Sequence, residues 1–332
     1  MRAGWIDDTP VTRVWSGGRR PVEEADPADR LGSNVCGWTL ERLLGVGGTA
    51  AVYEATALEG ERAAVKVLAR RGVDEATLRR DAGREARLTR AVPHSGVTRV
   101  LGEATCTDGS AAIVMELLHG HTLDERRCVN GGALALHAAL PIFDAMLDVA
   151  GAAHDAGVIH HDIKPGNVFL TRDGGVKLID FGLARRKRET HFVGGWFGTP
   201  GFVAPEQARG EALRHCDSRA DIWSLGATMF VVLSGHSVHP AMNHACEVSL
   251  AATRAARSLR TSAPDLPDAL IEIVDRALAF EPTARWPSVR AMRAALCDVI
   301  AALLAPAPRP SGVQLVADGP GVDAKHFGRL GY

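Results

Sequence analysis

Residues 158–182 constrain the chain most, because two apolar runs there enclose a tight cluster of charged and amide side chains. The segment reads VIHHDIKPGNVFL and, after a short glycine turn, VKLIDFG. Both runs are rich in β-branched residues, so we expect short strands on either side of a loop. The cluster holds Asp162, Lys164 and Asn167, with Asp180 further along. These groups can orient a hydroxyl nucleophile, offset phosphate charge and hold magnesium.

The spacing His160-x-Asp162-x-Lys164-Pro-x-Asn167, followed by Asp180-Phe-Gly, resembles the catalytic loop and Asp-Phe-Gly motif of protein kinases. Each residue alone could be an ordinary loop residue, but their joint occurrence is hard to obtain by chance. The chain is most similar to the bacterial, eukaryotic-like Ser/Thr protein kinases. The resemblance implies a two-lobed α+β fold, with a small antiparallel sheet and one helix before a larger, mainly helical lobe.

The same resemblance assigns roles to these side chains and implies ATP with Mg²⁺ or Mn²⁺ as cofactors. Asp162 would accept or orient the proton of the substrate hydroxyl. Lys164 would offset charge on the γ-phosphate during transfer. Asn167 and Asp180 would bind the metal ion through oxygen ligands.

A glycine-rich turn follows the apolar segment that begins at Trp38 and reads GVGGTAAVY over residues 45–53. Glycine lets backbone amides approach phosphate oxygens, although the turn alone is equally typical of an ordinary hairpin. The kinase loop is Gly-x-Gly-x-x-Gly-x-Val, and Ala50 stands here at the third glycine.

Lys66 interrupts the apolar segment Ala63–Val67, where an unpaired charge would be costly to bury. Glu85 follows in a predicted helix, and the spacing resembles the kinase lysine–glutamate pair that anchors ATP phosphates. Asp81, one helical turn earlier, remains an alternative partner, and a solvated helix face is the alternative role of Glu85.

The apolar segment Ala111–Leu118 is predicted to be a buried strand that leads into a polar turn. By resemblance, Met115 guards the adenine pocket and Glu116 to Leu118 form the hinge. The full set of residues that the resemblance places around ATP is Leu44, Gly45, Val46, Gly47, Gly48, Thr49, Ala50, Ala51, Val52, Ala64, Lys66, Glu85, Met115, Glu116, Leu118, Phe169 and Asp180.

Residues 183–204 resemble an activation segment, and GTPGFVAPE at 198–206 resembles the peptide-docking loop that closes it. The resemblance pairs Glu206 with Arg285 and has Thr199 bond to the catalytic Asp and Lys. The same comparison has Asp221 hold the backbone of the catalytic loop. The sequence RRKRET at 185–190 makes Thr190 a candidate for autophosphorylation, although its basic run could equally be a solvated turn.

His161 departs from the family, because kinases activated by loop phosphorylation have Arg immediately before the catalytic Asp. The first interpretation is a neutral residue in a kinase that does not need this coupling. The alternative hypothesis is that charged His161 binds a loop phosphate, so that activity rises as the pH falls.

Residues 1–34 carry Pro, Gly, Asp and Arg without periodicity, although Trp5 and Trp15 leave docking of this segment open. Helices are predicted at 133–156, 221–233, 268–280 and 289–304. The predicted divisions are a flexible extension at 1–34, a kinase domain at 38–304 with lobes at about 38–118 and 119–304, and a Pro/Gly-rich tail at 305–332.

The composition of the 332 residues mainly argues against certain partners and sites. The formal net charge of −1 gives no reason to expect nucleic acid as a partner. Six scattered cysteines without a Cys-x-x-Cys pair predict neither zinc nor disulfides, and favour the reducing cytoplasm. The sequence has no run of eighteen apolar residues, so we expect no membrane span.

The expected partners are therefore ATP and protein substrates of unknown identity, with dimerisation for trans-autophosphorylation as an open possibility. Lys164 with Gly-Thr-Pro favours Ser/Thr over Tyr substrates. Ala50 and His161 are the only support for a pseudokinase or scaffold that binds without turnover. A small-molecule phosphotransferase shares the His-x-Asp loop but lacks the peptide-docking segment found at 198–206.

Overall fold

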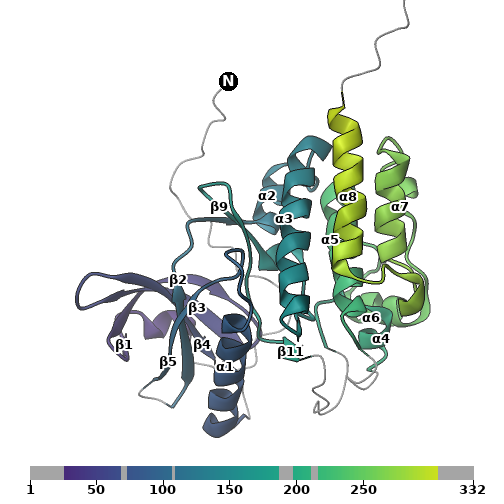
Figure 1. The fold of residues 1–332 in the computed structure, drawn as a ribbon. Helices are drawn as coiled ribbons and strands as arrows, with labels where there is room; N and C mark the ends of the chain where they lie inside the picture. Colours follow the sequence, from purple (N-terminus) through teal and green to yellow (C-terminus); the bar gives the residue numbers. More distant parts are fainter. Residues whose placement is uncertain (1–25, 69–72, 107–108, 187–196, 211–215, 306–332) are drawn as a thin grey trace, which may run out of the picture.

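The computed structural model describes residues 26–68, 73–106, 109–186, 197–210 and 216–305. It has an N-terminal part built on a sheet and a C-terminal part built from helices (Figure 1). The first sheet is antiparallel, in the order β1-β2-β3-β4-β6-β5. Its strands are β1 (Asn34–Val35), β2 (Trp38–Val46), β3 (Ala50–Ala57), β4 (Arg62–Leu68), β5 (Val100–Thr105) and β6 (Ala111–Glu116).

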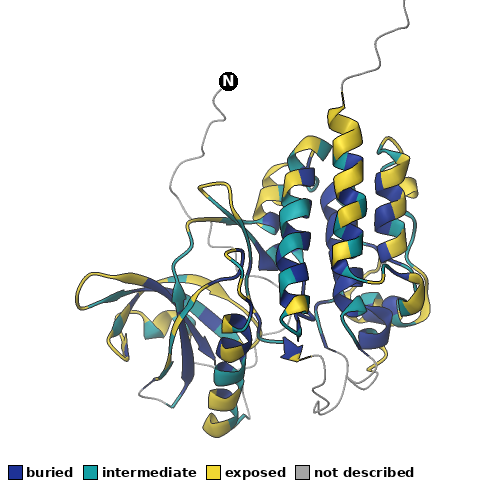
Figure 2. Cartoon of the chain, in the orientation of Figure 1, coloured by how far each residue is buried: buried dark blue, intermediate teal, exposed yellow. Residues whose placement is uncertain are grey.

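One long helix, α1 (Glu75–Arg90), packs against β5 and β6 of this sheet. Its buried stripe includes Leu78, Ala82 and Ala86, each four residues after the last, which join the same apolar cluster as β6. Glu85 lies next to this stripe and is buried, so the packing of the helix directs its carboxylate toward the sheet. Leu88 and Thr89 of α1 are also buried, and the rest of the helix is exposed or half-buried (Figure 2).

The folded part begins earlier than the sequence predicts, because the end of the expected flexible extension is ordered. Pro27–Arg30 form the short 3₁₀ helix η1, and the buried Tyr53 donates its hydroxyl to the carbonyl of Pro27 at 2.8 Å. Arg30 donates to Ser110 at 3.0 Å. We call residues 26–35 the N-terminal strap. The start of the strap is held by these side-chain contacts, and its end is held by the pairing of β1 with β2.

The C-terminal part surrounds α5 (Arg219–Ser234), which is buried along its whole length from Ala220 to Leu233. Two small sheets, in the orders β10-β9-β7 and β11-β8, are formed by β7 before α2 and by the strands between α3 and α4. The other helices are α2 (Leu123–Val129), α3 (Leu136–Asp155), α4 (Pro205–Ala208), α6 (His244–Thr253), α7 (Asp268–Ala277) and α8 (Val289–Leu304), with 3₁₀ helices η2 (Pro165–Asn167), η4 (Leu259–Thr261) and η5 (Pro282–Ala284). The small strands are β7 (Gly120–Thr122), β8 (Val158–Ile159), β9 (Val168–Thr171), β10 (Val176–Leu178) and β11 (Arg185–Arg186).

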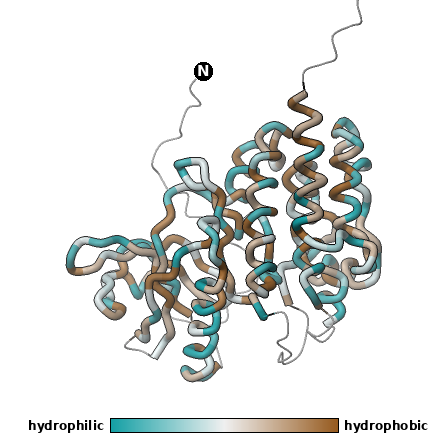
Figure 3. The backbone as a smooth tube through the Cα atoms, in the orientation of Figure 1, coloured by the Kyte–Doolittle hydropathy of each residue, from teal (hydrophilic) through white to brown (hydrophobic). Residues whose placement is uncertain are grey.

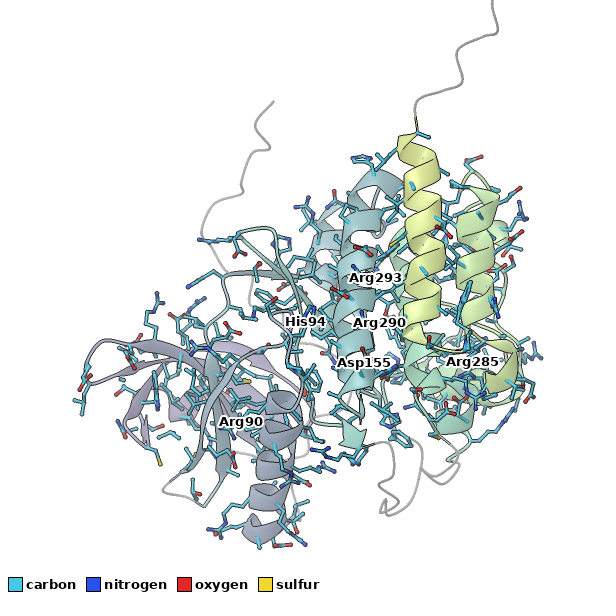
Figure 4. All side chains as sticks on the ribbon, in the orientation of Figure 1. Arg90, His94, Asp155, Arg285, Arg290 and Arg293 are labelled. Carbon is cyan, nitrogen blue, oxygen red and sulfur yellow. The ribbon has the colours of Figure 1, made fainter. Side chains whose placement is uncertain are left out.

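An ionic seam joins α3 to α8 (Figure 4). Arg290 donates to Asp148 at 2.8 Å and to Asp155 at 2.9 Å, and Arg293 pairs with Asp144 at 2.7 Å. His94, from the segment after α1, approaches Asp148 to 3.3 Å. Through His94 the seam connects the segment between α1 and β5 to the helical part.

Among the described residues, α3 alone is long and apolar enough to cross a membrane. Half of that stretch is buried, and α3 packs against α8 and α5, as expected for the core helix of a folded domain. The C-terminal end of α8 is also strongly hydrophobic (Figure 3). Leu304 there is exposed.

Candidate active site

The ammonium group of Lys66 joins three parts of the site. Lys66 lies on β4, and its Nζ is 2.6 Å from Glu85 of α1 and 2.7 Å from Asp180. Burial by itself would lower the pKa of Lys66, but the Asp180 and Glu85 carboxylates overcome this and raise the pKa above its usual value. Asp81 pairs instead with Arg84 at 3.5 Å, so the structure favours Glu85 over the alternative partner.

Asp162 is held from both carboxylate oxygens. Thr199 donates its hydroxyl to Oδ1 at 2.6 Å, and Asn167 donates its Nδ2 to Oδ2 at 3.0 Å. Lys164 lies 2.9 Å from Oδ2 and also donates to the Thr199 hydroxyl at 2.6 Å. The residues that the sequence places in one loop are thus brought together with Thr199, thirty-seven positions away.

Asp221, near the start of α5, holds the backbone of the catalytic loop through hydrogen bonds. Its carboxylate accepts the backbone N–H of His160 at 2.8 Å and of His161 at 2.7 Å, and His154 approaches it to 2.8 Å. Burial would raise the pKa of Asp221, but the hydrogen bond and charge of His154 hold it well below its usual range. An ionised Asp221 is therefore part of the folded loop, in the position that the resemblance implied.

His161 is 2% exposed, and its ring packs edge-on against Phe197 with centroids 5.3 Å apart. Burial lowers the pKa of His161 to about 4, and Arg185 adds to this effect, although Asp221 opposes it. Its Nδ1 has no hydrogen-bond partner within the described ranges. The imidazole is therefore neutral at pH 7. Burial and the lowered pKa therefore favour the interpretation of a neutral His161 over that of a charged His161 that binds a loop phosphate.

The donor set around Asn167 and Asp180 fits a divalent cation bound together with phosphate. Asn167 uses its Nδ2 to donate to Asp162, which leaves its amide oxygen as the group suited to a metal. Burial would raise the pKa of Asp180, but Lys66 lowers it strongly, so the carboxylate is ionised. The described residues contain no group of three or more His, Cys, Asp or Glu side chains able to hold a metal without phosphate oxygens.

Most of the predicted nucleotide residues lie on neighbouring strands of the first sheet or in the turn between β2 and β3, whereas Glu85 lies on α1, Phe169 on β9, and Leu118 and Asp180 lie outside the strands. Val52 on β3 pairs with Lys66 on β4, and Ala64 pairs with Met115 on β6. The glycine-rich turn joins β2 to β3, and its Gly47 N–H donates to the Ala50 carbonyl at 2.8 Å. Strand register thus places the turn and the lysine on neighbouring strands.

Lys177 contacts the predicted hinge and was not identified from the sequence. Its ammonium lies 2.9 Å from the carboxylate of the predicted hinge residue Glu116 and 2.8 Å from the Ser95 carbonyl. Glu116 also accepts the Arg99 N–H at 2.7 Å. Lys177 lies three residues before Asp180, but no local pattern shows that it reaches the hinge.

The end of the activation segment is anchored in the helical part. Glu206 and Arg285 form a two-point ion pair, with both distances 2.8 Å. Both residues are buried. Thr190, the predicted phosphorylation site, lies outside the described residues.

The protein kinase domain model matches residues 38–297. The chain belongs to the protein kinase family. Pkn1 of Myxococcus xanthus is 32% identical over 335 residues, which cover 94% of this chain and 46% of Pkn1. PknA of Mycobacterium tuberculosis is 32% identical over 299 residues, which cover 85% of this chain and 65% of PknA. Both carry the name serine/threonine-protein kinase.

Solved kinase structures share the fold. The crystal structure of the Mycobacterium tuberculosis PknI kinase domain matches with a TM-score of 0.61 and 25% identity, over 81% of this chain and 98% of that domain. The two-lobed kinase architecture predicted from the sequence is therefore confirmed. The chain spans about half the length of Pkn1.

Proposed function

We propose that this chain is an active Ser/Thr protein kinase, which transfers the γ-phosphoryl group of Mg-ATP or Mn-ATP to hydroxyl groups of protein substrates. The observation that carries the proposal is the simultaneous contact of Lys66 with Glu85 and Asp180. It joins the helix, the sheet and the metal-binding motif in one assembly, as phosphoryl transfer requires.

The chain's own residues would mainly position the reactants and neutralise charge. Lys66 would hold the nucleotide phosphates. Asp162, oriented by Thr199 and Asn167, would face the substrate hydroxyl and accept or orient its proton. Lys164, beside Asp162, would offset charge on the transferred group. The metal ion, held by Asn167 and Asp180, would supply further charge neutralisation at the phosphates.

The test uses purified protein, radiolabelled ATP, a divalent cation and a generic protein substrate such as myelin basic protein. We expect labelling of the substrate and of the chain itself, and loss of both in Asp162→Asn or after chelation of the metal. Nucleotide binding without turnover would instead support a pseudokinase. Labelling of small molecules without labelling of protein would support a small-molecule phosphotransferase.

Further proposals concern the setting of this activity. None of the six cysteines, all within the described ranges, forms a disulfide, which supports action in the reducing cytoplasm. Dimerisation for trans-autophosphorylation would appear as labelling of an Asp162→Asn chain by added wild-type chain.

A further inference from the structure

His161 adopts a backbone conformation that side-chain-bearing residues rarely take. Its φ is 64°, in the left-handed region. Such a residue persists only where its surroundings hold it in place, and these conformations cluster at functional sites. The conformation of His161 matters for the reaction because the next residue is Asp162.

The two peptide groups that flank His161 are held from different elements. Asp221 of α5 accepts its N–H at 2.7 Å. On the other side, Gln207 of α4 donates from Nε2 to the His161 carbonyl at 3.2 Å. That carbonyl shares a rigid plane with the Asp162 N–H, so fixing its direction also fixes the direction in which Asp162 leaves the loop.

The same amide group reaches the activation segment. Nε2 of Gln207 also lies 3.5 Å from the carbonyl of Phe197, two residues before Thr199. Thr199 in turn donates to Asp162. Gln207 is fully buried, so no water can replace its two contacts. The Gln207 side chain thus contacts both the residue that precedes Asp162 and the segment that carries Thr199.

We propose that Gln207 is a positioning residue for phosphoryl transfer, which orients Asp162 through the His161 carbonyl and steadies Thr199 through the Phe197 carbonyl. This inference rests on the proposed kinase activity. The edge-on contact between His161 and Phe197 joins the same two segments, so buried uncharged groups add to the contacts that Thr199 makes with Asp162 and Lys164.

A purely local role for Gln207 makes a different prediction. Its Oε1 also accepts the Ala204 N–H at 3.3 Å, at the start of α4. If this cap were its only role, substitution would lower stability without changing turnover by the folded molecules. The experiment therefore has to separate turnover from folding.

The test compares wild type with Gln207→Met, which keeps the length but removes the donor, and with Gln207→Asn, whose shorter amide cannot reach both carbonyls. Turnover is expressed per molecule that binds ATP, since Gln207 touches none of the predicted nucleotide residues. We expect kcat to fall about 10- to 100-fold in Gln207→Met, because small misplacements of a catalytic group have effects of this size. The KM for ATP should change by less than about twofold.

Trp286→Phe is the matched control, because it also removes one side-chain N–H that donates to a backbone carbonyl, here Ile273 at 3.1 Å. It should leave kcat per ATP-binding molecule unchanged. An unchanged kcat in both folded Gln207 variants would overturn the proposal, as would loss of ATP binding in both, which would make Gln207 a residue of general stability. An inactive wild type would instead refute the kinase activity itself.

Discussion

Arg285 grips Glu206 with two nitrogens, each 2.8 Å from a different carboxylate oxygen, across a gap of seventy-nine residues. Arg285 also donates to the carbonyls of Arg219 and Ala279. Nearly all donors of the guanidinium are therefore used inside the fold. This pair anchors the end of the activation segment to the C-terminal helical part.

Breaking that pair should destabilise the protein strongly. Glu206→Gln and Arg285→Met each leave a buried partner without its opposite charge, and we expect the free energy of unfolding to fall by about 3–5 kcal/mol. Urea unfolding followed by circular dichroism measures this. The exposed pair Arg79–Glu75 is the control, since Arg79→Ala should cost less than about 1 kcal/mol. Equal losses at the two sites would contradict the structure.

Glu85 and Asp81 can be separated by matched amide substitutions on the same helix. Glu85→Gln removes a charge 2.6 Å from Lys66, so phosphoryl transfer should fall by about 10-fold or more through poorer placement of the lysine. Asp81→Asn removes a charge that pairs with Arg84 and leaves the Lys66–Glu85 contact in place, so it should keep nearly full activity. Initial rates with saturating peptide substrate measure both losses. A larger loss in Asp81→Asn than in Glu85→Gln would mean that Lys66 pairs with Asp81.

The Thr199 hydroxyl should matter for turnover and not for nucleotide binding. Thr199→Val keeps the shape but removes the bond to Asp162, so we expect kcat to fall by about 10- to 100-fold with little change in the KM for ATP. Thr199→Ser retains the hydroxyl and should recover most of the rate. Steady-state kinetics of wild type and the two variants test this. A fully active Thr199→Val enzyme would show that the Thr199 hydroxyl has no role in turnover.

His161 should make stability depend on pH. Its pKa is about 4 in the folded chain and about 6.5 when unfolded, so between these values the unfolded chain binds more protons. The contribution of a neutral His161 is therefore fully present above pH 6.5 and is lost as the pH falls toward 4, by about 3 kcal/mol. His161→Phe cannot take up a proton and should show a shallower loss in urea unfolding between pH 7 and pH 4.5. Parallel curves for the two proteins would contradict the buried neutral ring.

The proximity of the candidate site residues Asp162, Lys164 and Asn167 could be predicted because they stand close together in one short loop. The structure brings their side chains into contact through the Asp162 carboxylate. The Lys66–Glu85 pair is different, since helical spacing alone leaves both Glu85 and Asp81 open. Packing of the helix against the sheet makes that choice.

The environment of His161 could not be predicted, because it depends on Phe197 and Gln207 from a distant segment. The sequence shows a titratable residue next to the catalytic Asp, but its charge is decided by burial. The same reason explains why Lys177 was missed as a support for the hinge. Contacts of this kind follow from tertiary packing and leave no local pattern.

The N-terminal strap has a practical consequence for making shortened versions of the protein. A fragment trimmed to the family match, 38–297, would start inside the sheet, without the residues that pair with the outer edge of β2. Bare strand edges of this kind recruit other chains and promote aggregation. The same cut would end within α8 and discard the buried Val299. Soluble expression therefore calls for boundaries that begin at or before Asp26 and extend to Ala305.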